Sequence, residues 1–249
     1  MGILDGRVAI VTGAGQGSGR GVALALAAEG ASVAVVGRTE SKLVDVAQEI
    51  EDRGAIAIPL QCDVGDTAQI DAVVKATAGE FGRIDILAQA AHHNSRVGNL
   101  LEVSEEDIEL LWTTGPKATL HFMRQCHPYL RGGGSIINFG SSTQMKPAHF
   151  GVYAATKDAI RSLSRAASIE WGPDRIRVNV MAPVTDSPNW LADRQRRGDT
   201  SDPGLGVPLG RVGDAESDIG RVAVFLAGDD SAYVTGQFIL VDGGFAYHR

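Results

Sequence analysis

The sequence has few cysteines and no long apolar run, and each shortage excludes a class of protein. Two cysteines, Cys62 and Cys126, are too few for a disulfide framework, which favours a reducing compartment. No apolar stretch approaches the roughly 18 residues needed to cross a bilayer. The first residues also lack the basic start and apolar core of a secretion signal. We therefore expect a cytoplasmic protein with no membrane partner.

Basic residues are also in the minority, because 30 acidic side chains outweigh 23 lysines and arginines to give a net charge of −7. Proteins that bind nucleic acid by neutralising phosphates carry a basic excess or a basic stripe. Neither is present, so we expect no nucleic-acid partner. Glycine, in contrast, is abundant at 31 of 249 residues without a short repeat, which indicates special backbone conformations at particular turns.

Short apolar runs alternate with longer segments of helical periodicity. Runs that are apolar throughout are typical of strands buried on both faces of a parallel sheet. The expected strands are Val8–Val11, Ser32–Val36, Ala55–Leu60, Asp85–Ala90, Ser135–Phe139, Arg177–Met181 and Phe238–Val241. After a first helix around Val22–Ala28, the expected helices are Ser41–Arg53, Thr67–Phe81, Ser104–Leu130, Val152–Trp171 and Ala215–Leu226. No linker divides the chain, which predicts one α/β domain over residues 1–249, with a roughly seven-stranded parallel sheet flanked by helices.

One segment does not fit this pattern. Asn189–Pro208 is polar, is punctuated by proline and glycine, and carries three arginines within Arg194–Arg197. Such segments usually lie on the surface rather than in the core, and they often carry binding or catalytic residues. We expect a substrate lid at about residues 188–208.

A glycine cluster follows the first expected strand directly. Thr12–Gly19 has the pattern TGxxxGxG, with Gly13, Gly17 and Gly19 in place, and it opens the first helix. A strand–turn–helix of this kind points backbone N–H groups and a helix N-terminus at a pyrophosphate. We expect Gly13, Gln16, Gly17, Ser18 and Gly19 to bind a dinucleotide; the alternative is that the glycines only allow the chain to turn.

The ends of the second and third strands indicate which dinucleotide is bound. An acidic residue after the second strand favours NAD, whereas an arginine accommodates the 2′-phosphate of NADP. The sequence has Arg38 there, which favours NADP, with NAD as the alternative if Arg38 is only a solvated charge. Asp63 and Val64 follow the third strand, where Asp63 either accepts a hydrogen bond from adenine or serves as a turn aspartate.

Tyr153 and Lys157 lie four residues apart, on one face of an expected helix. An unperturbed tyrosine, with a pKa near 10, is a poor base at neutral pH. A neighbouring ammonium favours the phenolate, so Lys157 is expected to lower the pKa of Tyr153. Ser141 lies just past the fifth expected strand, at the same edge of the sheet.

Together these pieces resemble the short-chain dehydrogenase/reductase family over essentially the whole chain. The matching pieces are Thr12–Gly19, Asp63, Asp85–Ala90, Ser141, Tyr153–Lys157, Arg177–Asn179, Pro208–Arg211 and the stretch from Tyr233 to Gly244. The resemblance implies a Rossmann-type three-layer fold and hydride transfer with Tyr153 as catalytic acid/base. It also implies that Ser141 binds the substrate oxygen and that Lys157 holds the nicotinamide ribose.

Further cofactor contacts, from Ala90, Ala91, Pro183 and Val184, follow from the same resemblance, as does a homotetramer built partly from the long helices. The sequence departs from the family pattern at three places. His92 stands where the family has glycine, and Val184 does likewise. The family's helix asparagine, which holds a water beside the lysine, falls on Gly115.

Pro116 follows Gly115 and should kink or break the long helix, because proline lacks an N–H and its ring crowds the preceding turn. A freed backbone carbonyl, Thr113 or Thr114 could then replace the asparagine. Loop residues after the fourth and fifth strands are expected to shape the substrate site. They are His92, His93, Gln144 and His149. No third ligand accompanies the paired histidines at a helpful spacing, so we expect no metal.

The sequence therefore predicts an NADP(H)-dependent, or alternatively NAD(H)-dependent, oxidoreductase that interconverts a small-molecule carbonyl and a secondary alcohol. Gly115 and Val184 suggest the alternative: a catalytically impaired dinucleotide-binding homologue that acts as a sensor or binds a partner.

Overall fold

A computed structural model describes residues 2–93, 98–142, 150–185, 191, 195, 200–201, 204 and 206–246. Seven parallel strands form one sheet in the order β3-β2-β1-β4-β5-β6-β7. Their bounds are β1 Val8–Thr12, β2 Ser32–Gly37, β3 Ala57–Gln61, β4 Ile86–Gln89, β5 Ser135–Phe139, β6 Arg177–Pro183 and β7 Phe238–Val241. This confirms the predicted single α/β domain and its strand count.

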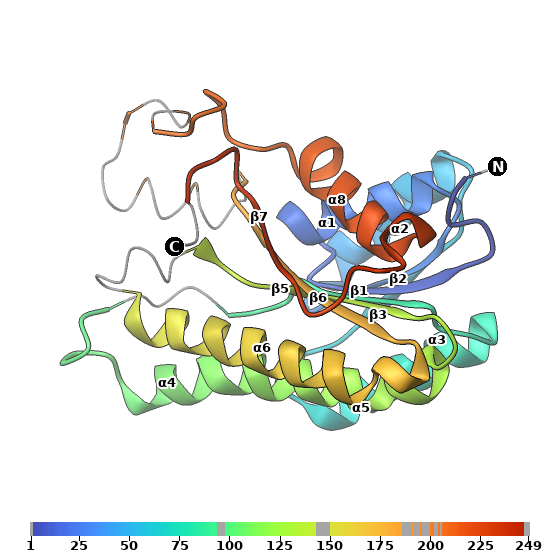
Figure 1. The fold of residues 1–249 in the computed structure, drawn as a ribbon, viewed down its shortest axis with the longest axis horizontal. Coiled ribbons are helices and arrows are strands. Elements are labelled where there is room, and N and C mark those ends of the chain that lie inside the picture. Colours follow the sequence, from blue (N-terminus) through green and yellow to red (C-terminus); the bar gives the residue numbers. More distant parts are fainter. Residues whose placement is uncertain are drawn as a thin grey trace.

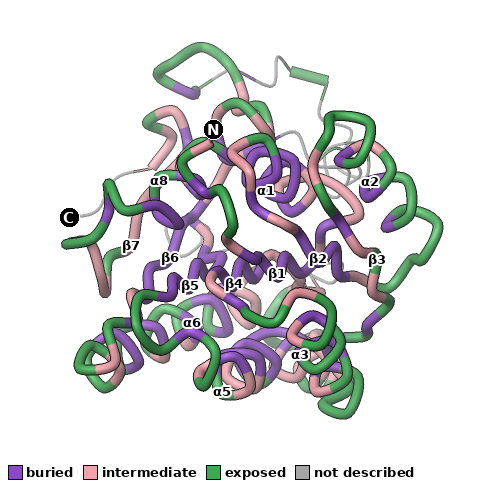
Figure 2. The backbone as a smooth tube through the Cα atoms, turned by 90° about the vertical axis from the view of Figure 1, so that its right-hand side faces the viewer, coloured by how far each residue is buried: buried purple, intermediate pink, exposed green. Residues whose placement is uncertain are grey.

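Helices cover both faces of the sheet. The α-helices are α1 Gly17–Ala28, α2 Glu40–Asp52, α3 Thr67–Phe81, α4 Glu105–Trp112, α5 Ala118–Leu130, α6 Gly151–Glu170 and α8 Arg221–Ala227. The shorter helical elements are η1 Thr113–Lys117, η3 Gly172–Asp174, η4 Ala215–Gly220 and η5 Asp229–Ser231. Figure 2 shows α1, α2 and α8 on one face and α3, α5 and α6 on the other, and Figure 1 places α4 beside α6.

The strands are buried to different extents, depending on their place in the sheet. β1 and β5, in the interior, are buried at every position, as expected for a sheet covered on both sides. At the edge, only Ala57 of β3 is buried and the rest of the strand is intermediate or exposed, so the expectation that every strand is buried on both faces is wrong there. Alternate side chains of β1 enter opposite cores: Ala9 and Val11 pack with α1 and α2, and Ile10 packs with α3 and α5.

The predicted long helix over Ser104–Leu130 divides into α4, η1 and α5. Pro116 has no N–H to give to the carbonyl four residues before it, at Trp112. The chain widens there into the π-helical turn η1, in which the N–H of Ala118 bonds to the carbonyl of Thr113. The predicted helix Ala215–Leu226 divides similarly into η4 and α8. Within the described ranges, no helix is long and apolar enough to cross a membrane.

A buried polar network fixes α6 against the sheet. In β5, the Asn138 amide accepts a hydrogen bond from Gln89 of β4 at 2.9 Å and donates to Ser164 of α6 at 2.8 Å. Gln89 also donates to the carbonyl of Thr119 in α5. Because buried polar groups are costly when unpaired, this network specifies how α5 and α6 seat on the sheet.

Asn138→Ala is expected to lower the free energy of unfolding by about 2 to 3 kcal/mol, since the buried Gln89 and Ser164 each lose a hydrogen bond and a buried amide is replaced by empty space. Urea denaturation measures the change. The control is Gln48→Ala, which removes an exposed amide bonded to Asp52 on α2 and should change stability by less than about 0.5 kcal/mol. Equal losses in the two variants would contradict a stabilising role for the network.

Candidate active site

The carboxyl ends of the parallel strands open into a cavity of about 430 Å³. Doubly wound sheets bind ligands at this edge. The wall runs from the glycine turn after β1, past the ends of β2, β3 and β4, to α6. Of the residues predicted to bind cofactor or to react, the cavity wall contains Gly13, Gln16, Gly17, Ser18, Gly19, Arg38, Asp63, Val64, Ala90, Ala91, Ser141, Tyr153, Lys157 and Pro183.

Val184 is the exception among these predicted residues. Its backbone N–H bonds to the carbonyl of Val241, and its carbonyl accepts from Gly213, so the residue joins the end of β6 to neighbouring segments. It is not part of the cavity wall. Gln144, His149 and most of the predicted lid at 188–208 lie outside the described residues.

The glycine turn packs too closely for side chains. Gly13 has φ +68°, and a Cβ there would lie 2.8 Å from the backbone nitrogen of Ala91; a Cβ on Gly19 would lie 2.3 Å from the Gly13 carbonyl oxygen. Gln16, at the N-cap of α1, makes no side-chain capping bond and instead accepts from Lys42 Nζ at 2.6 Å. The first turn of α1 therefore keeps N–H groups for an anion, which fits the pyrophosphate of a dinucleotide.

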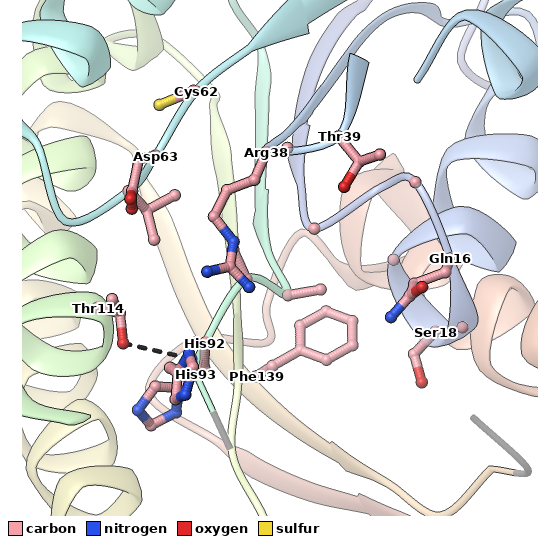
Figure 3. Close-up of a pocket in the computed structure, with 18 of the residues that line it drawn as sticks. Gln16, Ser18, Arg38, Thr39, Cys62, Asp63, His92, His93, Thr114 and Phe139 are labelled. Carbon is pink, nitrogen blue, oxygen red and sulfur yellow. Dashed lines mark hydrogen bonds between the residues drawn. The ribbon is translucent and has the colours of Figure 1, made fainter. Parts of the chain in front are cut away.

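Basic groups surround the end of β2. Arg38 is exposed, and its guanidinium extends over the cavity, as Figure 3 shows. Lys42 belongs to the first turn of α2 and also lines the wall. The sequence analysis missed Lys42, although a basic residue in the first turn of the helix after the second strand was a signal that could have found it.

Asp63, after the neighbouring strand β3, makes a turn. Its carboxylate accepts from the N–H of Gly65 at 2.9 Å, and its own N–H bonds to Gln69. The turn-aspartate alternative is therefore present in the structure, and the same side chain faces the cavity (Figure 3).

Tyr153 and Lys157 stand at the start of α6. The Lys157 side chain is 4% exposed, and its Nζ donates to the Phe139 carbonyl at the end of β5 over 2.8 Å. The same Nζ lies 5.6 Å from the centre of the Tyr153 ring. The Phe139 carbonyl was missed by the sequence analysis, which considers side chains and has no signal for a backbone acceptor.

Burial dominates the ionisation of both groups. It lowers the pKa of Lys157 to about 7, because an ammonium loses its water shell there. It raises the pKa of Tyr153 to about 12, which a hydrogen bond with Ser141 only partly offsets. The sequence predicts a lowered pKa for Tyr153, and the structure shows the reverse, because loss of solvation outweighs the hydrogen bond with Ser141.

The predicted substrate residues His92 and His93 both line the cavity. Thr114 Oγ1 accepts from the His93 N–H at 3.2 Å and donates to the Leu110 carbonyl, which ties this loop to the end of α4 (Figure 3). Thr113 is directed elsewhere, to Glu109. Beside Gly115, where the family has asparagine, the structure places the His92 ring.

Within the described part of the chain, no three His, Cys, Asp or Glu side chains gather where they could hold a metal ion. The cavity instead has the parts that a nicotinamide dinucleotide needs: a close glycine turn at one end, and Tyr153 with the buried Lys157 at the other.

Comparison with known proteins agrees with this geometry. A family model described as enoyl-(acyl carrier protein) reductase matches residues 13–246. A 12alpha-hydroxysteroid dehydrogenase from Clostridium sp. is 39% identical over 98% of both chains. Similar solved structures include a short-chain type dehydrogenase/reductase from Mycobacterium ulcerans, with TM-score 0.90, 30% identity and coverage of 97% of this chain and 90% of that one.

Another similar structure is a 7 alpha-hydroxysteroid dehydrogenase complexed with NADH and 7-oxo glycochenodeoxycholic acid, with TM-score 0.89, 27% identity and coverage of 97% and 94%. None of these relatives supports the alternative of an impaired homologue. Since the matches span nearly the whole chain, it belongs to the short-chain dehydrogenase/reductase family and is an oxidoreductase that interconverts a carbonyl and a secondary alcohol with a nicotinamide dinucleotide.

Proposed function

We propose that this chain is an NADP(H)-dependent reductase in which Tyr153, Ser141 and Lys157 carry out the proton chemistry. The observation that carries the proposal is the pair of Tyr153 and the buried Lys157 in the wall of a cavity that reaches back to the glycine turn. The bound dinucleotide supplies the hydride to the carbonyl carbon.

Each side chain has a defined task at the substrate oxygen. Tyr153, protonated at neutral pH because burial raises its pKa to about 12, gives its hydroxyl proton to the oxygen as negative charge develops there. Ser141 hydrogen-bonds the same oxygen and is already bonded to Tyr153, so both donors are in place before the reaction. The Lys157 ammonium, held by the Phe139 carbonyl, stabilises the phenolate that remains.

For the substrate, we propose a ring ketone on a large apolar skeleton, of the steroid type. Support comes from the similarity to two hydroxysteroid dehydrogenases, one of them complexed with an oxo bile acid. Exposed apolar side chains lie near the start of α6, two residues before Tyr153: Leu100 is 70% exposed and lies over Gly151, and the adjacent Leu101 is 93% exposed.

We propose NADP rather than NAD because Arg38 and Lys42 stand at the end of β2, where a 2′-phosphate lies in this fold. Among the described residues no carboxylate pairs with the Arg38 guanidinium, which leaves it available to an anion. We also propose a homotetramer, as is common in the family; the exposed Tyr129 on α5 and Ile169 on α6 are apolar groups that such contacts would cover.

Wild-type protein should oxidise NADPH with 12-oxo or 7-oxo bile acids, and Tyr153→Phe should lower kcat by about 10²- to 10⁴-fold because the proton donor is gone. Cofactor absorbance measures turnover, and fluorescence titration shows that NADPH still binds. Tyr233→Phe, at a fully exposed tyrosine after η5, is the matched control and should keep full activity. Retention of most activity in Tyr153→Phe would refute the assigned role.

Reduction should slow as pH rises through about 7. The pKa of Lys157 lies there because of burial, and above it the amine is neutral and no longer stabilises the phenolate, whereas Tyr153 stays protonated. The measurement is kcat/KM for the carbonyl substrate against pH at saturating NADPH. Lys157→Met should be slow and lack this step. A flat profile from about pH 6 to 9, or the same step in Lys157→Met, contradicts the account.

Arg38→Asp should shift preference from NADP toward NAD. Loss of a charge-assisted bond and the added repulsion should reduce kcat/KM for NADPH by roughly 10- to 100-fold and leave the value for NADH nearly unchanged. Lys75→Asp, which makes the same charge change on an exposed position of α3, is the control. A cofactor ratio that moves equally in both variants shows that Arg38 does not contact the phosphate.

A further inference from the structure

The His92 ring occupies the space that a side chain at Gly115 would need. A Cβ on Gly115 would lie 2.6 Å from His92 Nε2, closer than side-chain carbons approach such atoms, and 3.0 Å from Cε1. Gly115 is buried within the π-helical turn η1, whereas His92 comes from the loop after β4. Because Gly115 has no side chain, the imidazole can pack directly against this turn.

The ring is anchored to the helix in one tautomer. Its Nε2 lies 3.0 Å from the carbonyl oxygen of Leu111 at the end of α4. A carbonyl only accepts hydrogen bonds, so Nε2 carries the proton. Burial and the nearby Lys157 charge hold the pKa of His92 well below its usual range, which leaves Nδ1 without a proton.

Nδ1 is buried and has no hydrogen-bond partner among the described residues. An unpaired buried acceptor costs free energy, so the ring keeps its place through other contacts. One of these contacts is the bond to Leu111. The other is a stack on the Tyr153 ring: the two ring centres are 5.2 Å apart and the planes are inclined by 21°. Stacked aromatic pairs in this range are stabilising.

We propose that His92 is a positioning residue for Tyr153: its imidazole, admitted by Gly115 and anchored to Leu111, is the wall against which the phenol stacks in reacting geometry. This inference rests on the proposed function of Tyr153. The imidazole transfers no proton; it fixes the ring that does and keeps water from it. Displacements of about 1 Å at a reacting group can cost 100-fold in rate, so the wall matters to turnover.

Rate measurements test the positioning role. His92→Ala should lower kcat by about 10- to 100-fold and leave the Kd of NADPH, measured by fluorescence titration, within about twofold. His92→Phe keeps a flat ring and should recover part of kcat. In His92→Ala, water can enter beside Lys157, Tyr153 and His93. This solvation should raise the pKa of Lys157 and move the falling limb of the pH profile to higher pH. An unchanged kcat and pH profile in His92→Ala would overturn the proposal.

A stability cycle tests the pair without any turnover. Gly115→Ala should lower the urea midpoint in wild-type protein, where the new Cβ meets the imidazole, and lower it much less in a His92→Ala background. Gly79→Ala, at an exposed α3 position with nothing near its Cβ, is the control and should not depend on His92. An equal loss from Gly115→Ala in both backgrounds would overturn the proposed fit.

Nitrogen NMR of histidine-labelled protein adds a third readout, with His92→Phe identifying the signal. We expect the Nε2–H tautomer and a titration midpoint of His92 well below that of an ordinary histidine; the other tautomer or an ordinary titration would contradict the anchoring. If wild-type protein turns over no carbonyl, the proposed function fails, while the stability cycle and the spectra still decide whether His92 and Gly115 form the wall.

Discussion

Burial of the Lys157 ammonium against the end of β5 is the constraint on which the site depends. Its bond to the Phe139 carbonyl fixes the amine one helical turn from Tyr153, and the burial that this requires moves the pKa of each group toward its neutral form. The pair is thus a proton donor beside an amine of near-neutral pKa, not a preformed phenolate. In the proposed mechanism, charge appears on the tyrosine only as the substrate oxygen takes its proton.

This arrangement needs α6 to be seated accurately on the sheet, and the buried amides provide that. Gln89 and Asn138 are adjacent in β4 and β5, and Asn138 reaches Ser164 on α6. From the same strand ends, Ala91 bonds through its N–H to Thr12 and closes over the glycine turn. The phosphate end and the reacting end of the cavity are therefore held by one set of strand termini.

The sequence was sufficient for the parts that depend on local pattern. Continuous apolar runs located the strands, the TGxxxGxG turn located the phosphate end of the cavity, and the four-residue spacing located Tyr153 beside Lys157. Three features depend on contacts between distant segments and could not be predicted: the Phe139 carbonyl as a lysine anchor, the burial that reverses the pKa shift of Tyr153, and the fit of His92 to Gly115. Pro116 predicted an interrupted helix, but not that the interruption is a π-helical turn.

The most direct test of the account is the titration of Lys157 itself. NMR of the lysine ε-position in labelled protein, with Lys157→Met used to assign the signal, reports this ionisation without any substrate. The account predicts a midpoint near about 7, because the group is buried. A midpoint close to the ordinary lysine value of about 10.4 would contradict it.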